Sequence, residues 1–182
     1  TVTERHDRRV EQLLHMQQTD PAGRHRGAYP DEYGIYFPGS ASGILETFTA
    51  AMLHPGSKFH RNPLLAERMR LAAGYLERMQ GPQGNISLPI TNFNSPPDTA
   101  FVVNGVATAA AIARRHGARE LVALLETFLR RAGAGMAAGG IHTPNHRWVL
   151  CSALAQVHDL FPHPSYLRRI DEWLAEGIDI DE

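Results

Sequence analysis

The chain has 182 residues, of which 43% are hydrophobic, and this is enough apolar material for one domain with a buried core. Positive and negative charges nearly cancel, leaving a formal net charge of -1. That balance argues against a nucleic-acid-binding protein, because such proteins normally carry a basic excess. The sequence has no apolar run of about eighteen residues, so we expect no membrane-spanning segment. No signal peptide is recognisable, and the compartment stays open between cytoplasmic and secreted.

The single cysteine, Cys151, excludes an internal disulfide and a cysteine-rich zinc site. It lies in the apolar run 148–154, so we expect a packing residue rather than a nucleophile. His142 and His146 are separated by Pro144, which breaks the helical spacing that a metal-binding pair needs. The sequence therefore predicts neither a metal site nor a cofactor.

Apolar residues recur at the spacing of amphipathic helices along most of the chain. Pro63 suits a first helical turn, and Gly81 suits a helix end. The sequence predicts seven helices, at about 5–17, 42–53, 63–80, 99–116, 118–134, 144–159 and 164–175. Residues 86–90 are compatible with a short extended segment, but Pro89 restricts it to an edge.

The connections between these helices alternate between elaborate and short. Residues 20–39, 81–98 and 135–144 form the elaborate loops, which are long or rich in glycine, proline and polar residues. In an up-and-down array every second connection lies at the same end, so these three loops should lie together. Long loops in compact domains are usually functional, and this end is therefore the predicted site.

This alternation predicts an all-α fold and a single domain over residues 1–182. We expect antiparallel helical hairpins that form part of an (α/α) toroid. Because a toroid needs more helices than these, we expect an incomplete barrel that belongs to a longer parent chain.

The first loop carries Arg24 and Arg26 together with Tyr29, Tyr33 and Tyr36. Aromatic faces stack on the apolar side of a sugar ring, and arginine pairs with a carboxylate through two hydrogen bonds. Arg26, Tyr33 and Tyr36 are therefore candidate contacts for an acidic sugar. Capping of the helix ends is the alternative role for the tyrosines.

The second loop contains Asn92, Asn94 and Asp98. Asp98 suits the N-cap of the helix predicted at 99–116, because an Asp side chain accepts hydrogen bonds from unpaired amides there. A catalytic role for Asp98 is the alternative. Asn92 and Asn94 are less easily explained by turn chemistry, and we expect them to point into a cleft.

The third loop is the most specific of the three, and it reads Gly139-Gly140-Ile141-His142-Thr143-Pro144-Asn145-His146-Arg147-Trp148. The glycines permit unusual backbone angles, and the proline suits the start of a helix. An amide, an imidazole, a guanidinium and an indole follow directly. A cap role for Asn145 and a core role for His146 are the plain alternatives. Four such side chains together favour a functional site, to which we also assign His142.

An Asn–His pair at the start of an inner helix resembles the catalytic motif of toroid polysaccharide lyases of the heparinase II/III-like and alginate lyase types. The stretches 92–98 and 143–148 are similar to ones in that group. The resemblance implies cleavage of a uronic-acid-containing oligo- or polysaccharide by β-elimination. It implies that Asn145 holds the substrate carboxylate, that His146 removes the proton, and that Arg147 and Trp148 contact the substrate. A neutral imidazole can accept a proton near pH 7.

In that group a tyrosine protonates the leaving oxygen, and it normally follows the Asn–His helix. Tyr166 is the tyrosine after Trp148 here, but it lies beside a short connection at the other end. We therefore expect the acid either beyond Glu182 in a longer parent or among the tyrosines of the first loop.

Two further functions fit the sequence. A toroid glycoside hydrolase needs two carboxylates beside a cleft, and the long loops offer Asp31, Glu32 and Asp98 for that role. A non-catalytic helical module that binds carbohydrate or protein is the other alternative, because fold alone does not determine function.

Overall fold

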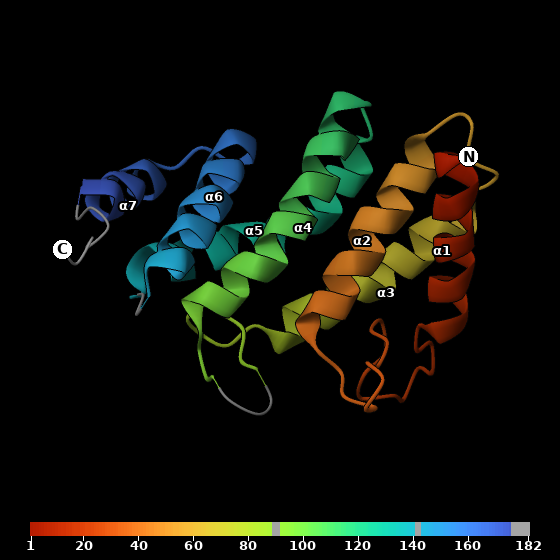
Figure 1. The fold of residues 1–182 in the computed structure, drawn as a ribbon, viewed down its shortest axis with the longest axis horizontal. Helices are drawn as coiled ribbons and strands as arrows, with labels where there is room; N and C mark the ends of the chain where they lie inside the picture. The colour runs from red at the N-terminus through yellow and green to blue at the C-terminus, as the bar shows by residue number, and fades with distance from the viewer. Residues whose placement is uncertain (89–91, 141–142, 176–182) are drawn as a thin grey trace.

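The computed structural model describes residues 1–88, 92–140 and 143–175, and these residues fold into seven α-helices (Figure 1). The helices are α1 (Val2–Met16), α2 (Pro38–Leu53), α3 (Pro63–Met79), α4 (Pro96–Arg115), α5 (Arg119–Ala138), α6 (Pro144–Leu160) and α7 (Pro164–Ala175). The seven predicted helices and the all-α class are confirmed. Within the described ranges the extended pairing is limited to isolated bridges, such as the one between Gln80 and Ile86.

The helices pack in two layers. In one layer α2, α4 and α6 lie side by side, with α4 between the other two. In the other layer α3 packs against α5, and α5 packs against α7, while α1 packs against α2. Each helix of the first layer also packs on the helix that follows it in the chain. The hairpins are therefore stacked next to one another in chain order.

The three elaborate connections lie at one end of this array. Figure 1 shows the α1–α2, α3–α4 and α5–α6 connections at the bottom of the view and the three short connections at the top. The prediction that the long loops lie at the same end is confirmed. We call this end, formed by the α1–α2, α3–α4 and α5–α6 connections, the loop end.

Proline and polar caps determine where the helices begin. Proline occupies an early position of α2, α3, α4 and α6, where its missing N–H is not needed by the helix. The prediction that Asp98 caps α4 is wrong. The helix begins earlier, at Pro96, and Ser95 is the N-cap that accepts a hydrogen bond from the Asp98 amide. Two adjacent prolines in the first turn concealed this start.

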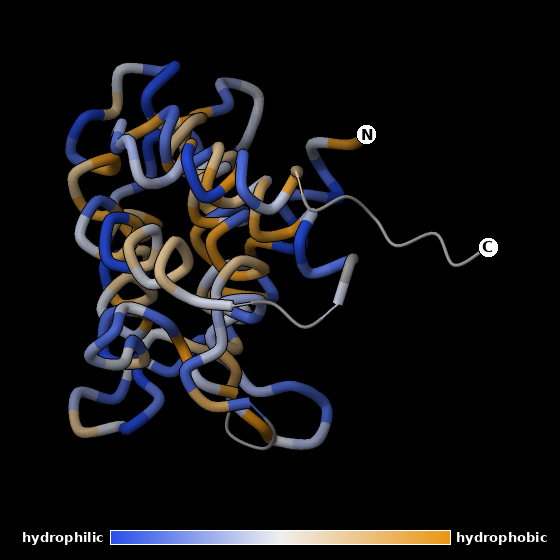
Figure 2. The backbone as a smooth tube through the Cα atoms, turned by 90° about the vertical axis from the view of Figure 1, so that its left-hand side faces the viewer, coloured by the Kyte–Doolittle hydropathy of each residue, from blue (hydrophilic) through white to orange (hydrophobic). Residues whose placement is uncertain are grey.

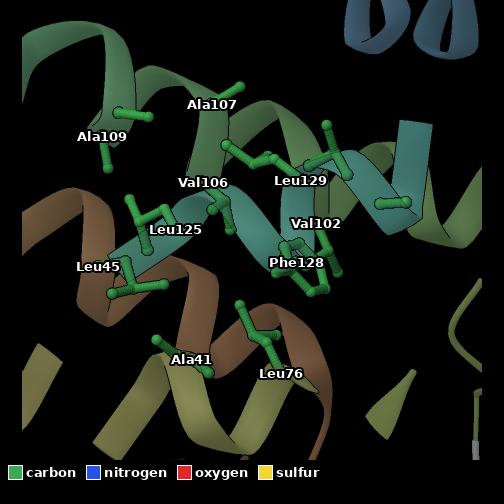
Figure 3. Packing of buried hydrophobic residues seen from close by; sticks show 14 of the residues in the cluster. Ala41, Leu45, Leu76, Val102, Val106, Ala107, Ala109, Leu125, Phe128 and Leu129 are labelled. Atoms are coloured by element: carbon green, nitrogen blue, oxygen red, sulfur yellow. The ribbon is translucent and has the colours of Figure 1, made fainter. Parts of the chain in front are cut away.

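The core lies between the two layers. Figure 3 shows Val106 of α4 beside Leu125 of α5 at this interface, and both are fully or almost fully buried. The tube in Figure 2 is orange mainly inside the molecule and blue mainly at the outer turns. Burying a large apolar side chain contributes about 1.5–3 kcal/mol, so this interface dominates the stability.

Cys151 belongs to this core, as predicted. Its side chain is buried, and burial raises the pKa of its thiol although Arg147 opposes the shift. A thiol of this kind packs rather than reacts. None of the helices in the described ranges is both long and apolar enough to cross a membrane.

A buried glutamine anchors the first loop to the neighbouring hairpin. The side-chain amide of Gln17 donates to the carbonyl oxygens of Gly27 and Arg68, at 3.0 Å in both cases. Gly27 has a φ of +103°, and a Cβ there would lie 2.0 Å from the carbonyl oxygen of Leu71. Only glycine fits, because both the backbone angle and the close approach exclude a side chain.

The second loop repeats this arrangement. The side-chain amide of Gln80 donates to the carbonyl oxygens of Gly84 and Phe128, at 2.9 and 3.0 Å. Gly84 has a φ of +87°, and a Cβ there would lie 2.1 Å from the carbonyl oxygen of Arg131. Gln80 and Gly84 contact α5 in the same relative positions in which Gln17 and Gly27 contact α3. The two hairpins are therefore structural repeats with little sequence likeness.

Candidate functional site

Polar and aromatic side chains line the seam where α4 packs on α6, and a hollow lies along this seam between Thr108 and Gln156. The α6 wall of the seam carries side chains at helical spacing, and so does its α4 wall. We call this seam the α4–α6 groove and define it by Phe101, Asn104, Thr108, Asn145, Trp148, Ser152 and Gln156.

Three polar side chains join the walls in the middle of this groove. The side-chain amide of Gln156 donates to Asn104 Oδ1 at 2.6 Å, and the Ser152 hydroxyl donates to the same oxygen at 3.3 Å. The Gln156 amide also lies 3.3 Å from the Ser152 hydroxyl oxygen. These side chains are exposed or half-buried, so their remaining hydrogen-bonding groups can meet a ligand that lies along the groove.

The hollow of the groove lies in the half that is farther from the loop end. It has a volume of about 460 Å³, with Thr108 and Arg115 on one side and Gln156 and Asp159 on the other. Asp159 also forms an ion pair with Arg114, and both side chains of this pair are exposed to solvent. The hollow is within the size range of ligand pockets, which is about 300–1,000 Å³.

Aromatic and imidazole rings form the mouth of the groove at the loop end. Phe101 and Trp148 are 55% and 53% exposed, which is unusual for side chains of this size. The ring of His146 meets the ring of Phe101 edge-on, with centroids 6.3 Å apart and an angle of 86°. The mouth therefore combines apolar ring faces with a group that can exchange a proton.

His146 is half-buried beside this mouth. Its Nδ1 is buried and has no hydrogen-bond partner in the described part of the chain. Buried polar atoms are usually paired, so an unpaired imidazole nitrogen often marks a functional position. Asn145, the preceding residue, is exposed and lies on the same helical stripe as Trp148. Arg147 is half-buried and close enough to Cys151 to act on its thiol.

The largely exposed aromatic side chains lie toward the loop end of the molecule. Within the described residues, every Phe, Tyr or Trp that is largely exposed lies in a loop of the loop end or in the first turns of α4 and α6. They are Tyr33, Phe93, Phe101 and Trp148. The other large hydrophobic side chains with high exposure are aliphatic, for example Val2 and Leu64. Such a grouping favours a ligand with flat apolar faces.

The asparagines predicted for the second loop have structural roles. The Asn92 side-chain amide donates to the Asp98 carboxylate at 3.1 Å, and the Ser95 hydroxyl donates to the same carboxylate oxygen. Asn94 has a φ of +48°, a conformation that asparagine tolerates better than most residues, and its amide donates to Ser87. Both side chains are exposed at the loop end, so a ligand contact stays a prediction.

The three residues of the first loop that were predicted to contact a sugar differ in exposure and position. Tyr33 is 79% exposed, whereas Tyr36 is half-buried and stacks on His25 with centroids 4.1 Å apart. Arg26 is half-buried, and its carbonyl oxygen accepts a hydrogen bond from Arg78. The structure thus places Tyr36 and Arg26 beside α3, away from the α4–α6 groove.

The remaining candidates are placed as follows. His142 lies outside the described residues. Tyr29 accepts a hydrogen bond from Arg9 of α1, and Tyr166 is buried between α7 and α5, where its hydroxyl donates to the Arg130 carbonyl oxygen at 3.4 Å. Neither tyrosine lines the groove, so the acid of an elimination reaction is not assigned to them.

Sequence reasoning missed Phe101, Asn104 and Gln156. The signal was present in α4, where Phe101, Asn104 and Thr108 recur at spacings of three and four among alanines and valines. Larger or polar side chains on one stripe of a small, apolar helix indicate a face that is open to solvent or ligand.

Another hollow, of about 600 Å³, lies at the opposite end, next to the α4–α5 turn. Its walls are mainly the apolar side chains of Met52, Met69, Leu121 and Leu124. We place the candidate site in the groove instead, because polar and aromatic groups converge there. In the described ranges no three His, Cys, Asp or Glu side chains gather in a way that could hold a metal ion.

Comparison with known proteins adds no family to this geometry. No protein-family description, no curated protein sequence and no solved structure matches the chain. The functional argument therefore depends on the groove and on the chemistry of its residues.

Proposed function

We propose that this chain is the helical part of a polysaccharide lyase and that it cleaves a uronic-acid-containing oligo- or polysaccharide by β-elimination in the α4–α6 groove. We further propose that its stacked hairpins belong to an (α/α) toroid, in which the layer of α2, α4 and α6 is the inner one. The two-layer order of the helices is compatible with this arrangement.

One observation carries the proposal. His146, with a buried and unpaired Nδ1, lies at the mouth of a groove beside the exposed ring of Phe101. The exposed amide of Asn145 precedes it, and Trp148 follows one turn later on the open stripe of α6. An amide, an imidazole and two ring faces are the groups that an acidic sugar chain requires for binding and deprotonation.

The chemistry assigns one step to each residue. Asn145 donates to the substrate carboxylate and so stabilises the enolate that develops there. His146 removes the proton next to the carboxylate, and the electron pair forms a carbon–carbon double bond as the bond to the neighbouring glycosidic oxygen breaks. That oxygen takes up a proton from water, and His146 afterwards releases its proton to the solvent. Phe101 and Trp148 hold the adjacent sugar rings.

The test is an ultraviolet assay of the full natural chain with a panel of uronic acid polymers, because elimination creates a conjugated double bond that absorbs. His146→Ala should lower turnover about 10²–10⁴-fold, and Asn145→Ala about 10²–10³-fold. His116→Ala is the matched control, since His116 is exposed at the C-terminal end of α4, away from the loop end, and its loss should leave turnover unchanged.

Other outcomes contradict the proposal in different ways. New reducing ends without ultraviolet absorption would indicate a hydrolase. Polymer binding without any product would indicate a carbohydrate-binding module, which the exposed aromatic side chains also fit. Full elimination activity in the His146→Ala variant would remove His146 from the mechanism.

A further inference from the structure

A second cavity lies beneath the first loop, on the side of the molecule that faces α3. It has a volume of about 250 Å³, and its walls come from Arg24, His25 and Tyr36 of the loop and from Tyr75 and Met79 of α3. None of these residues takes part in the α4–α6 groove. The cavity is smaller than a typical drug-sized pocket, so it suits a ligand of about one sugar ring.

Two of the residues that line this cavity, His25 and Tyr75, each have a buried polar atom without a hydrogen-bond partner in the described part of the chain. Tyr75 is 1% exposed, and its hydroxyl is buried without a hydrogen-bond partner in the described part of the chain. Leaving such a group unpaired costs about 1–3 kcal/mol, and native proteins avoid this cost. The other buried tyrosine, Tyr166, has a partner in the Arg130 carbonyl oxygen. The Tyr75 hydroxyl therefore lacks an acceptor.

The charges around Tyr75 favour an anionic acceptor. Burial raises the pKa of the phenol, and the charges of Arg78 and Arg24 oppose that shift. Both of these groups are cationic, and the guanidinium of Arg78 lies 5.9 Å from the centre of the Tyr75 ring. Arg78 is also held by the Arg26 carbonyl oxygen, whereas Arg24 lines the cavity itself.

The loop over the cavity is held in shape before any ligand arrives. The Asp31 carboxylate accepts hydrogen bonds from the amides of Tyr33 and Ile35, both at 2.9 Å. The rings of His25 and Tyr36 stack with only 4° between their planes and form a flat wall. A site that is already ordered loses little entropy on binding.

We propose that this cavity binds a small carboxylate-bearing molecule of about the size of one sugar ring. The Tyr75 hydroxyl donates to one carboxylate oxygen, and Arg24 pairs with the carboxylate through its planar guanidinium. The stacked rings and Met79 contact the less polar face of the ligand. This site is independent of the lyase proposal, because it uses other residues and involves no reaction.

The experiment is isothermal titration calorimetry of the full natural chain with three probes: D-glucuronate, D-glucose and inorganic phosphate. Glucuronate should bind, and glucose, which has the ring but no carboxylate, should bind at least about tenfold more weakly. Phosphate should also bind more weakly, because the cavity offers one guanidinium and neutral donors. Glucose or phosphate binding as tightly as glucuronate would overturn the proposal.

Variants assign the binding to this cavity. Tyr75→Phe keeps the ring and should weaken glucuronate binding at least about tenfold, whereas the matched variant Tyr166→Phe should leave it unchanged. Arg24→Gln, at an exposed position that folding tolerates, should weaken binding similarly, with Arg8→Gln as its control. Binding that survives Tyr75→Phe and Arg24→Gln but is lost in Trp148→Ala belongs to the groove and overturns this proposal. Absence of binding by the wild-type chain, as expected if only a water molecule occupies the cavity, overturns it as well.

Discussion

The loops of the first two helical hairpins and the loop of the third are held in place by different hydrogen bonds. Buried Gln17, at the end of α1, donates hydrogen bonds to its own loop and to α3. Buried Gln80, at the end of α3, does the same to its own loop and to α5. At the end of α5 the equivalent position is Gly139, whose Cβ would lie 2.3 Å from Pro96. A side chain from another helix holds this loop instead, because Arg169 of α7 donates a hydrogen bond to the Gly139 carbonyl oxygen at 2.7 Å.

The difference has a consequence for the site. The long loops of the first two hairpins carry their own internal anchors and cover the ends of α1 and α3. The third connection is shorter than the predicted loop 135–144, because α5 continues to Ala138 and α6 begins at Pro144. Asn145 and Trp148 are exposed near the start of α6. The candidate site therefore lies where the repeated anchor is missing.

Replacing the glycine that packs against the neighbouring helix should lower the free energy of unfolding the most. Gly84→Ala places a Cβ 2.1 Å from the Arg131 carbonyl oxygen at a φ of +87°, so the free energy of unfolding should fall by at least about 3 kcal/mol. Gly117→Ala is the matched control, because Gly117 has a φ of +70° but open space around it, and it should cost about 1 kcal/mol. Urea denaturation measures both. Equal losses would show that the close approach is unimportant.

Replacing the buried glutamine that holds the loop should lower the free energy of unfolding by an intermediate amount. Gln80→Leu removes two hydrogen bonds from a buried side chain, while its amide oxygen, which is unpaired in the described residues, no longer has to be buried. The net loss in the free energy of unfolding should be about 2 kcal/mol. Gln18→Leu, at an exposed neighbour of Gln17, should change it by less than about 0.5 kcal/mol. If Gln17→Leu costs nothing while Gln80→Leu is destabilising, the two hairpins do not share one anchor.

The smallest change in the free energy of unfolding is expected for Asp7, at the other end of the molecule. Its buried carboxylate accepts hydrogen bonds from the Ser57 hydroxyl at 2.6 Å and from the Lys58 backbone amide at 3.1 Å. Burial acts to raise the pKa of Asp7, but these hydrogen bonds and the charge of Lys58 outweigh it and lower the pKa below its ordinary value.

A lowered pKa means that Asp7 stabilises the fold above its unfolded pKa of about 3.9 and that this contribution is lost as the pH falls through the folded value. Asp7→Asn should therefore cost about 1 kcal/mol at pH 7 and progressively less in acid. Thermal unfolding from pH 7 to pH 3 measures the difference, with exposed Asp171→Asn as the control. A constant difference across that range would contradict the ionised role of Asp7.

The helices and their order could be predicted because their signals are local. Apolar spacing within a few turns and prolines such as Pro63 and Pro144 mark them directly. The start of α4 was predicted too late because Asp98, a good capping residue, stands after two prolines that also fit a first turn. Ser95 is the cap, and its choice depends on the loop that precedes it.

The groove and the second cavity could be predicted only in part. Asn145, His146 and Trp148 could be proposed as candidates because they lie close together in the sequence. Their neighbour Phe101 was not found, because α4 and α6 meet only in the folded chain. Tyr75 has the spacing of a core residue of α3, and nothing local indicates that its hydroxyl lacks a partner.

By itself the sequence determined seven helices, their order, and the end of the molecule at which the connections after α1, α3 and α5 lie (Figure 1). Each of these follows from propensity and periodicity within about twenty residues. The tertiary structure alone decided which carbonyl oxygens Gln17 and Gln80 bind, which ring meets His146, and what surrounds Tyr75. These depend on distances between residues far apart in the chain, such as Gln17 and Arg68, which are 51 positions apart. Only packing of the finished layers sets such distances.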